Sequence, residues 1–379
     1  AARHFTTAPD RTQALADELA RLLADPRADA TLERFAIRWL RLDLLATVTR
    51  DEVQLPPLTP ELRRDLLTET TRLFIEVVRS NGRLADLLEA RHTHLNERLL
   101  SHYGLGALPP TALGPADARG FRRVELDTTP YGGLLSHGAL MATHALPQTS
   151  SPIHRGKLVR ERLLCEDLPL PPPNLDTSPP VMDPTRSTRE RYAQHASDPR
   201  CAACHDKIDP IGFGFERFDA VGRFRAMDGV HAIDERGVVT GLSTESGLLD
   251  VPFSGPHGLA STLAQSPHID RCYLLQQARF TLGREPASCT LDALAGLHAS
   301  RGATLSAAPV ALVSHPGFVT RRGAATELDT LASGAWDFDG PHTDPDPIDP
   351  PDPTDPTDPA DPEPSTAGLR WESVETARW

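Results

Sequence analysis

The spacing of apolar residues predicts helices over the first hundred residues of the chain. Thr59-Pro60 is typical of a helix start, with a Thr cap and a Pro at the first helical position, and Asn81-Gly82 is typical of a stop. Apolar residues recur near helical spacing between these signals and in shorter stripes before and after them. The stripes are Leu62, Leu66, Leu73, Phe74, Val77 and Val78; Leu32, Phe35, Ala36, Trp39 and Leu40; and Leu84, Leu87 and Leu88. We therefore expect a helical bundle over residues 1–110, with the large aromatic side chains of these stripes in its core.

Later segments repeat the helical pattern after a predicted β-hairpin. Helices are expected over residues 259–263, 272–282 and 291–298. Apolar residues on both sides of a polar turn predict one small hairpin from Gly229 to Gly247. Its strands would contain Val230 and Ala232 on one side and Val238 and Val239 on the other, around Asp234-Glu235-Arg236-Gly237. Residues 229–323 are thus predicted to be a hairpin followed by a helical C-terminal part.

Prolines interrupt the middle of the chain. Four of them lie between residues 169 and 173, where a helix cannot continue, and further breaks follow as far as residue 184. We expect an extended segment over Pro169–Pro184, either a strap over the surface or an ordinary connector between domains. Ser187 and Glu190 then have the spacing of a capping box, which predicts the start of a helix.

Composition narrows the class of protein. The net charge is -13 over 379 residues and no basic tract exceeds a few residues, which argues against a nucleic acid as partner. No apolar run reaches the roughly 18 residues that cross a bilayer. Residues 1–10 lack the charged and apolar regions of a signal peptide, as expected of a mature form or an excised fragment. Asp344–Pro364 consists almost entirely of Asp-Pro repeats, so residues 324–379 are expected to be a disordered linker and tail.

Cys201-Ala202-Ala203-Cys204-His205 is a C-x-x-C-H pentapeptide, the sequence to which c-type haem is attached. Two thiols on one helical turn add to the haem vinyl groups as thioethers, and the adjacent imidazole binds the iron from the proximal side. A zinc knuckle would need further ligands, and no second C-x-x-C or H-x-x-x-H is present to supply them. A thioredoxin-like thiol pair usually has a βαβ setting, which the pattern does not indicate. We therefore predict one covalently attached haem c, held by Cys201, Cys204 and His205.

The segment that follows resembles a known family. Residues 209–225 match D-P-x-G-F-x-x-E-x-F-D-x-x-G-x-x-R, which resembles the string after C-x-x-C-H in the secreted planctomycete-type cytochrome c family. The resemblance covers roughly residues 30 to 322. Its other segments are Leu95-Asn96-Glu97, His102-Tyr103-Gly104, Tyr131-Gly132-Gly133-Leu134-Leu135, Thr149–Gly156, Leu164-Cys165, Arg189-Glu190-Arg191 with His195, and Phe280–Arg284. It implies haem binding by a protein built from adjoining domains of unknown function, with no further activity assigned.

Two features of this segment are expected of residues that lie beside a haem. Pro210 and Gly212 are expected to turn the chain sharply after His205. Arg223 and Arg225 are candidates for pairing with the haem propionates. The alternative for these arginines is a surface position or a salt bridge to a nearby carboxylate, Asp219 or Glu216.

Four phenylalanines in the same segment are candidates for an apolar wall that keeps water from the iron. They are Phe213, Phe215, Phe218 and Phe224. Such a wall would raise the reduction potential. Plain core packing is the alternative reading and is favoured for at least two of the four.

The sixth ligand of the iron has several candidates. Met227 and His144 lead, and a Met ligand would raise the potential relative to a second His. Met141 and His195 are further candidates, although His195 also suits a hydrogen-bonding role. An open or water-ligated position is the remaining alternative.

The other three cysteines predict one disulfide. Cys272 and Cys289 lie on consecutive predicted helices, so in an exported protein we expect them to pair. This pairing leaves Cys165 without a partner in the chain. The runner-up pairing joins Cys165 to Cys272.

These observations predict a mostly α-helical protein in four parts: a helical domain over 1–110, a haem module with its proline strap over 120–228, and the 229–323 and 324–379 segments. The expected function is electron transfer or redox chemistry within a larger surface assembly, with redox proteins as partners. Two alternatives are a cell-surface scaffold with a vestigial haem module and a haem enzyme of the peroxidase type. Because haem c is attached outside the bacterial inner membrane, the expected location is the periplasm or the cell surface.

Overall fold

The structure is a computed structural model that describes residues 8–127, 129–169, 178–183, 185–193, 199–244 and 246–319. By internal contacts the chain divides into two units, Ala1–Val319 and Thr320–Trp379, and every described residue belongs to the first unit. The predicted Asp-Pro tail and most of the predicted proline strap lie outside the described residues.

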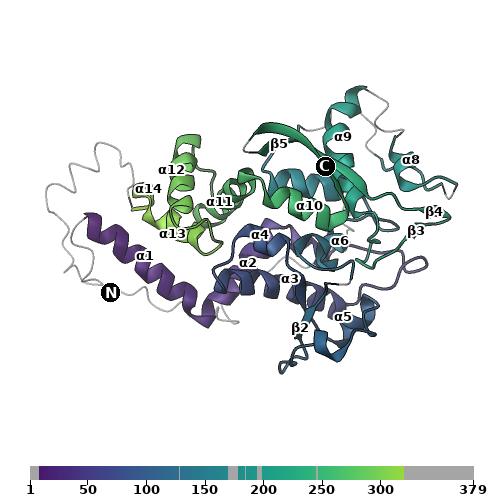
Figure 1. Cartoon of the computed structure of the whole chain (residues 1–379), viewed down its shortest axis with the longest axis horizontal. Helices are drawn as coiled ribbons and strands as arrows, with labels where there is room; N and C mark the ends of the chain where they lie inside the picture. Colours follow the sequence, from purple (N-terminus) through teal and green to yellow (C-terminus); the bar gives the residue numbers. More distant parts are fainter. Residues whose placement is uncertain are drawn as a thin grey trace, which may run out of the picture. The chain divides into compact units, whose positions relative to one another are not determined.

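Helices dominate the described chain, so the predicted mostly α class is confirmed (Figure 1). The α-helices are α1 (Ala8–Ala24), α2 (Asp29–Trp39), α3 (Pro60–Arg79), α4 (Leu84–Leu88), α5 (Glu97–His102), α6 (Gly138–Thr143), α7 (Pro152–Leu158), α8 (Thr188–Ala193), α9 (Pro199–Gly212), α10 (Gly255–Ala264), α11 (Pro267–Leu282), α12 (Ser288–Ala299), α13 (Ala307–Ser314) and α14 (Pro316–Val319). Short 3-10 turns are η1 (Pro26–Ala28), η2 (Leu42–Ala46), η3 (Pro110–Ala112), η4 (Leu134–Ser136) and η7 (Phe213–Phe215), and η5 (Val159–Leu163) is a π-helical turn after α7. The predicted helices at 259–263, 272–282 and 291–298 correspond to α10, α11 and α12.

The strands of the described residues form three two-stranded antiparallel sheets. They are β1 (His92–Leu95) with β2 (Arg122–Glu125), β3 (Met227–Asp228) with β4 (His231–Ala232), and β5 (Arg236–Thr244) with β6 (Gly247–Ser254). The predicted single hairpin from Gly229 to Gly247 is therefore wrong, because these two glycines turn two successive hairpins. Each glycine has a positive φ, +59° and +107°, which a tight turn favours. Asp234 accepts a hydrogen bond from the Arg236 backbone N–H at 3.1 Å, forming a bend between the hairpins.

The predicted helix α3 begins and ends at the expected signals. The Thr59 hydroxyl accepts a hydrogen bond from the Leu62 N–H at 3.2 Å. After Arg79, Asn81 adopts a φ of +59°, and the Gly82 N–H donates to the Val77 carbonyl at 2.8 Å. Local chemistry thus determines both ends of this helix.

Aromatic side chains join the N-terminal and C-terminal helices in one core. Phe35 stacks on Trp39 with ring centroids 5.8 Å apart, and Phe74 lies 5.8 Å from Phe35. Tyr273 of α11 meets the Trp39 ring edge-on at 5.4 Å. These rings are nearly or fully buried, as the sequence predicts for Trp39 and Phe74. The core therefore continues from α2 and α3 into α11.

A fully buried polar cluster lies under α3. The carboxylate of Glu69 accepts a hydrogen bond from the Tyr103 hydroxyl, and His137 contacts Thr70 through Nδ1 at 3.0 Å and Thr93 through Nε2 at 3.2 Å. Burial raises the pKa of Glu69 to about 8 and lowers the pKa of His137 to about 3. Both side chains are therefore neutral near pH 7.

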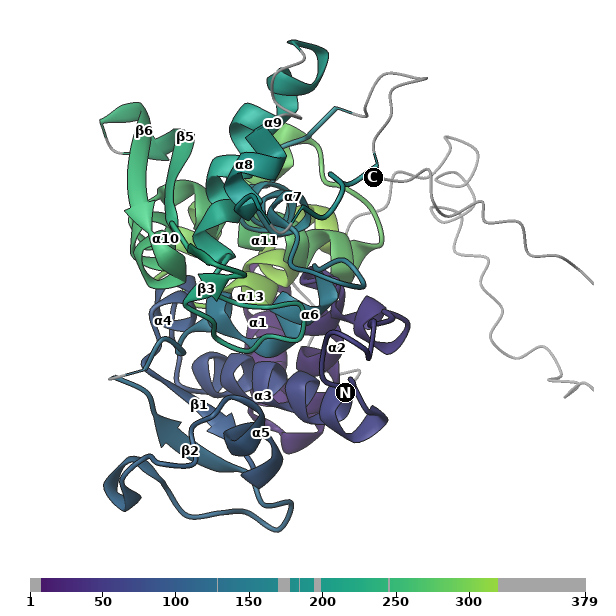
Figure 2. The same cartoon turned by 90° about the vertical axis from the view of Figure 1, so that its right-hand side faces the viewer.

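Helix α9 packs closely against α7. A Cβ on Gly156 would lie 2.1 Å from the Ile208 carbonyl oxygen, and one on Gly212 would lie 1.9 Å from the Pro152 oxygen. The Arg160 guanidinium adds a bond from Nε to the Lys207 carbonyl at 3.1 Å. Figure 2 shows α7, α8 and α9 grouped together, with the β5–β6 hairpin beside them. Two glycines thus allow the backbones to touch and fix the position of α9.

The disulfide joins Cys165 to Cys272, with the two Cα atoms 5.3 Å apart. The predicted Cys272–Cys289 pairing is wrong, and the runner-up pairing is the observed one. Cys272 lies in the middle of α11 on its buried face, 1% exposed, whereas Cys289 is exposed near the start of α12. The positions of the two predicted helices along the chain gave no sign that the Cys272 side chain is buried and the Cys289 side chain is exposed.

Candidate functional site

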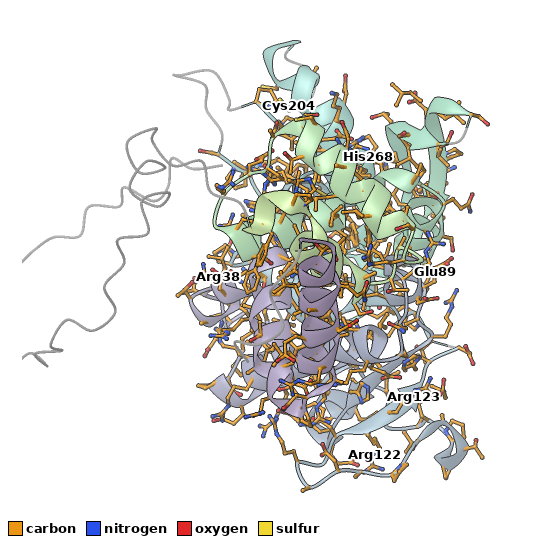
Figure 3. The ribbon with its side chains drawn as sticks, turned by 90° about the vertical axis from the view of Figure 1, so that its left-hand side faces the viewer. Arg38, Glu89, Arg122, Arg123, Cys204 and His268 are labelled. Atoms are coloured by element: carbon orange, nitrogen blue, oxygen red, sulfur yellow. A yellow bond between two sulfur atoms is a disulfide. The ribbon has the colours of Figure 1, made fainter. Side chains whose placement is uncertain are left out.

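Helix α9 contains all three residues of the predicted haem attachment. Cys201 lies three residues before Cys204 and four before His205, and residues at these spacings are neighbours on the surface of a helix. Both cysteines are partly exposed free thiols. Figure 3 shows Cys204 in the upper part of its view, away from Arg122 and Arg123 of β2. The helix thus presents two thiols and an imidazole together.

A buried carboxylate orients His205. Both oxygens of Asp209 lie 3.0 Å from Nδ1 of His205, and Asp209 is 5% exposed. Because a carboxylate accepts hydrogen bonds, the imidazole donates its Nδ1–H to Asp209, and Nε2 is the nitrogen that could bind a metal. This hydrogen bond is the main reason that the pKa of His205 is raised. Histidines that ligate metals commonly have such a partner.

The residues present on α9 fit a c-type haem. Two thiols with access to solvent could form thioethers, and an imidazole whose Nδ1 is held by Asp209 could bind iron through Nε2. The role of Asp209 was not identified from the sequence, although its position four residues after His205 was the available signal. No group of three or more His, Cys, Asp or Glu residues suited to a metal ion occurs within the described ranges.

Pro210 does not turn the chain. It lies inside α9, which continues to Gly212, so the sharp turn predicted directly after His205 is wrong. The fixed φ of proline is helical, and near the end of a helix its missing N–H removes only one intrahelical bond. The chain leaves the helix direction in η7, after Gly212.

The four phenylalanines have different surroundings. Phe215 and Phe218 are each 1% exposed and belong to the main core, which agrees with the core-packing alternative. Phe213 is buried beneath the Arg189 guanidinium, 4.2 Å from its ring centroid. Phe224 is 38% exposed and meets Phe218 edge-on. A haem-facing role stays a prediction for Phe213 and Phe224.

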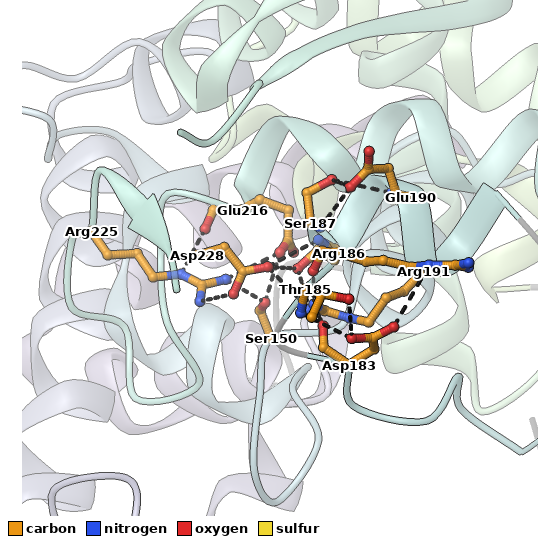
Figure 4. A network of polar contacts seen from close by, with 11 residues as sticks. Ser150, Asp183, Thr185, Arg186, Ser187, Glu190, Arg191, Glu216, Arg225 and Asp228 are labelled. Atoms are coloured by element: carbon orange, nitrogen blue, oxygen red, sulfur yellow. Dashed lines mark hydrogen bonds and ion pairs between the residues drawn. The ribbon is translucent and has the colours of Figure 1, made fainter. Parts of the chain in front are cut away.

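Arg225 is part of an internal ion-pair network rather than a free cation (Figure 4). Its guanidinium bonds to Glu216 at 3.2 Å, to Asp228 at 3.2 Å and to the Ser150 hydroxyl at 2.9 Å. Of the two alternatives, the salt bridge to Glu216 is the one present. Arg223, in contrast, is exposed. A propionate partner among them stays a prediction, and exposed Arg223 is the better placed of the two.

The same network attaches α8 to the segment that follows α9. Asp228 accepts hydrogen bonds from the Thr188 backbone N–H at 2.9 Å and from Arg191 at 3.1 Å (Figure 4). Arg191 is 5% exposed and Glu216 is 3% exposed, so these charges are largely shielded from water. The predicted capping box is also present, since the Ser187 N–H donates to the Glu190 carboxylate at 2.8 Å. The elements before and after α9 are therefore held together.

A buried arginine that the sequence analysis did not single out shapes the turn after α9. The Arg155 side chain is 0% exposed and donates to the carbonyls of Phe215, Phe218 and Asp219 at 2.7 to 2.9 Å. Its fourth bond is to the Met141 carbonyl at 3.1 Å. Five donors in a planar fork suit such a set of carbonyls.

The candidates for the sixth ligand are scattered. Met141 is fully buried in α6, and Nε2 of His144 donates to the Leu40 carbonyl at 3.2 Å. Met227 is 47% exposed on β3, and His195 lies outside the described residues. The identity of the sixth ligand stays a prediction.

Two family models match the chain. Residues 9–105 match PSD4, Protein of unknown function (DUF1592), and residues 131–228 match PSCyt3, Protein of unknown function (DUF1588). The two matched domains follow one another along the chain, and both are described as having no known function. The second match contains α7, α8 and α9, and with them the pentapeptide. No curated protein and no solved structure matches the chain. None of the described helices combines the length and apolar character needed to cross a membrane.

Proposed function

We propose that the protein is an exported c-type haem protein that transfers electrons, with one haem attached to Cys201 and Cys204 and its iron bound by His205. The observation that supports this most strongly is the pair formed by His205 and Asp209 on the helix that holds both thiols. A carboxylate partner of this kind suits a metal-ligating histidine in general, and the C-x-x-C-H spacing is what favours haem iron over zinc or a free thiol pair.

Different residues of the chain have different roles in holding the haem. Each thiol adds across one vinyl group, so that the sulfur bonds to carbon and its proton passes to the neighbouring carbon. His205 binds through Nε2, and Asp209 holds its Nδ1 proton. The network of Arg225, Glu216 and Asp228 keeps α8 in place beside α9. When bound, the haem supplies one-electron redox chemistry.

The proposed location is the periplasm or the cell surface of a bacterium, where haem c is attached. The Cys165–Cys272 disulfide supports an oxidising compartment. The proposed setting is a larger assembly, and the proposed partners are redox proteins.

Covalent attachment is tested with protein produced alongside the cytochrome c maturation machinery. Denatured wild-type protein should keep its haem stain on a gel, and the double substitution Cys201→Ala and Cys204→Ala should remove the stain. Cys289→Ala is the matched control, because it also removes an exposed free thiol and should keep the stain. Absence of stain in the wild-type protein would contradict the proposal.

The visible spectrum of the same protein distinguishes the three functions. A low-spin spectrum with a sharp reduced α-band supports electron transfer, whereas high-spin ferric bands favour a haem enzyme with an open sixth position. Absence of a Soret band would leave the third function, a cell-surface scaffold with a vestigial haem module. His205→Ala should lose the low-spin spectrum while keeping some thioether attachment, and an unchanged spectrum would exclude His205 as the ligand.

A further inference from the structure

The surroundings of Asp209 keep its charge close to His205. The carboxylate is 5% exposed, so water screens it poorly. Burial is the main reason that the pKa of Tyr192 of α8 is raised above its usual value, and the negative charges of Glu216 and Asp209 add to it. Asp206, on the same helix, is in contrast exposed to solvent.

The buried cations nearby bond to other groups. Arg155 binds backbone carbonyls, Arg160 pairs with Glu166 at 2.7 Å, and Arg225 pairs with Glu216 at 3.2 Å. The contact of Asp209 with the imidazole, 3.0 Å through either oxygen, is therefore a strong electrostatic influence on His205.

We infer that Asp209 lowers the reduction potential of the haem by making His205 an electron-rich iron ligand. This inference rests on the proposed function of α9. A carboxylate that accepts the Nδ1 proton gives the imidazole part of the character of its anion, and such a ligand is more basic. A more basic ligand, with a buried negative charge behind it, stabilises ferric iron over ferrous iron. A neutral acceptor such as a backbone carbonyl supplies neither effect to the same degree.

The inference opposes the expectation drawn from the phenylalanines. An apolar wall would raise the potential, but Phe215 and Phe218 belong to the core, so that at most Phe213 and Phe224 remain for such a wall. Asp209, in contrast, touches the ligand directly. The carboxylate therefore has the larger effect, and the reduced protein donates its electron readily to a one-electron acceptor.

The test is the midpoint potential of the holoprotein, measured by spectroelectrochemical titration. Asp209→Asn has the same size and keeps an oxygen to accept the Nδ1 proton, but it removes the charge. We expect its ferrous form to gain at least tenfold in stability relative to the ferric form, a rise of about 59 mV for one electron. Asp206→Asn is the matched control and should shift the potential far less, because water screens that exposed carboxylate. Asp209→Glu, which retains the charge, should stay nearer the wild-type value.

The outcomes separate this inference from the proposed function. Wild-type protein without covalent haem contradicts the function itself. Covalent haem in Asp209→Asn with a wild-type potential overturns the inference and leaves the function intact. If Asp209→Asn does not load haem, a measurement on the wild-type protein takes the place of its midpoint potential. This measurement is the iron–imidazole stretching frequency of the reduced protein, recorded after photolysis of bound carbon monoxide. A frequency typical of a histidine bonded to a neutral acceptor would overturn the inference.

Discussion

At the residue scale, Gly212 controls how closely α9 approaches α7. Any side chain at this position meets the Pro152 carbonyl oxygen, which lies 1.9 Å from the place of a Cβ. Backbone atoms cannot move aside as the end of a flexible side chain can, so the two helices would have to separate. The same separation would displace Ile208 and the turn of helix that contains His205.

We therefore expect Gly212→Ala to destabilise the protein by about 1 to 3 kcal/mol, the usual range for overpacking. Gly296→Ala is the control, because Gly296 lies inside α12 with nothing within 4 Å of its Cβ position. An alanine there should stabilise the helix by about 0.5 to 1 kcal/mol. Urea unfolding followed by circular dichroism measures both changes. Equal midpoints for Gly212→Ala and wild type would show that the contact with Pro152 relaxes freely.

At the element scale, the polar cluster under α3 joins four segments through side chains that are neutral when buried. The pKa of Glu69 is about 8 in the folded protein against a usual value of 4.5, so the folded state binds this proton more tightly than the unfolded state. Its contribution to stability is complete below pH 4.5 and is lost as the pH rises through about 8. His137 acts in the opposite direction, since its pKa of about 3 removes stability as the pH falls below its usual value of 6.5.

Glu69→Gln should therefore abolish most of the loss of stability between pH 4.5 and about 8 that the wild-type protein shows. The amide keeps an oxygen for the Tyr103 hydroxyl but cannot ionise. Glu61→Gln on the same helix is the control, because the side chain of Glu61 is 46% exposed and its pKa lies below its usual value. Free energies of unfolding from urea titrations at several pH values measure the effect. A Glu69→Gln protein that loses stability with rising pH as the wild type does would contradict it.

The elements that could be predicted from the sequence are those with local causes. Helix α3 has an apolar stripe within its own residues, a Thr cap directly before it and an Asn-Gly stop just after it. The hairpins were misplaced because Asp234-Glu235-Arg236-Gly237 also suits a turn, and only the strand pairing shows that the turns lie at Gly229 and directly before Gly247. The pentapeptide was visible as a motif, whereas the part of Arg155 in shaping the turn after α9 depends on a contact across 60 residues. The sequence pattern contains no signal for such a contact.

At the scale of the whole molecule, one core and one disulfide connect the segment that contains α9 to the C-terminal helices. Buried apolar residues form a continuous cluster from Leu32 to Leu312. The disulfide adds a covalent link between Cys165, two residues after η5, and the middle of α11. Because its cysteines are 107 residues apart, the link restricts a long stretch of the unfolded chain, which includes α8 and α9.

Removal of this link should destabilise the protein by about 2 to 5 kcal/mol, the range found when native disulfides are removed from secreted domains. The double substitution Cys165→Ala and Cys272→Ala tests this, and Cys289→Ala should leave stability nearly unchanged because its thiol is exposed. The haem spectrum should not change, since neither cysteine lies on α9. Peptide mapping of the oxidised protein under non-reducing conditions should give a fragment that joins Cys165 to Cys272. A fragment that joins Cys272 to Cys289 would contradict the observed pairing, and a double variant as stable as the wild type would show that the core alone holds α11 in place.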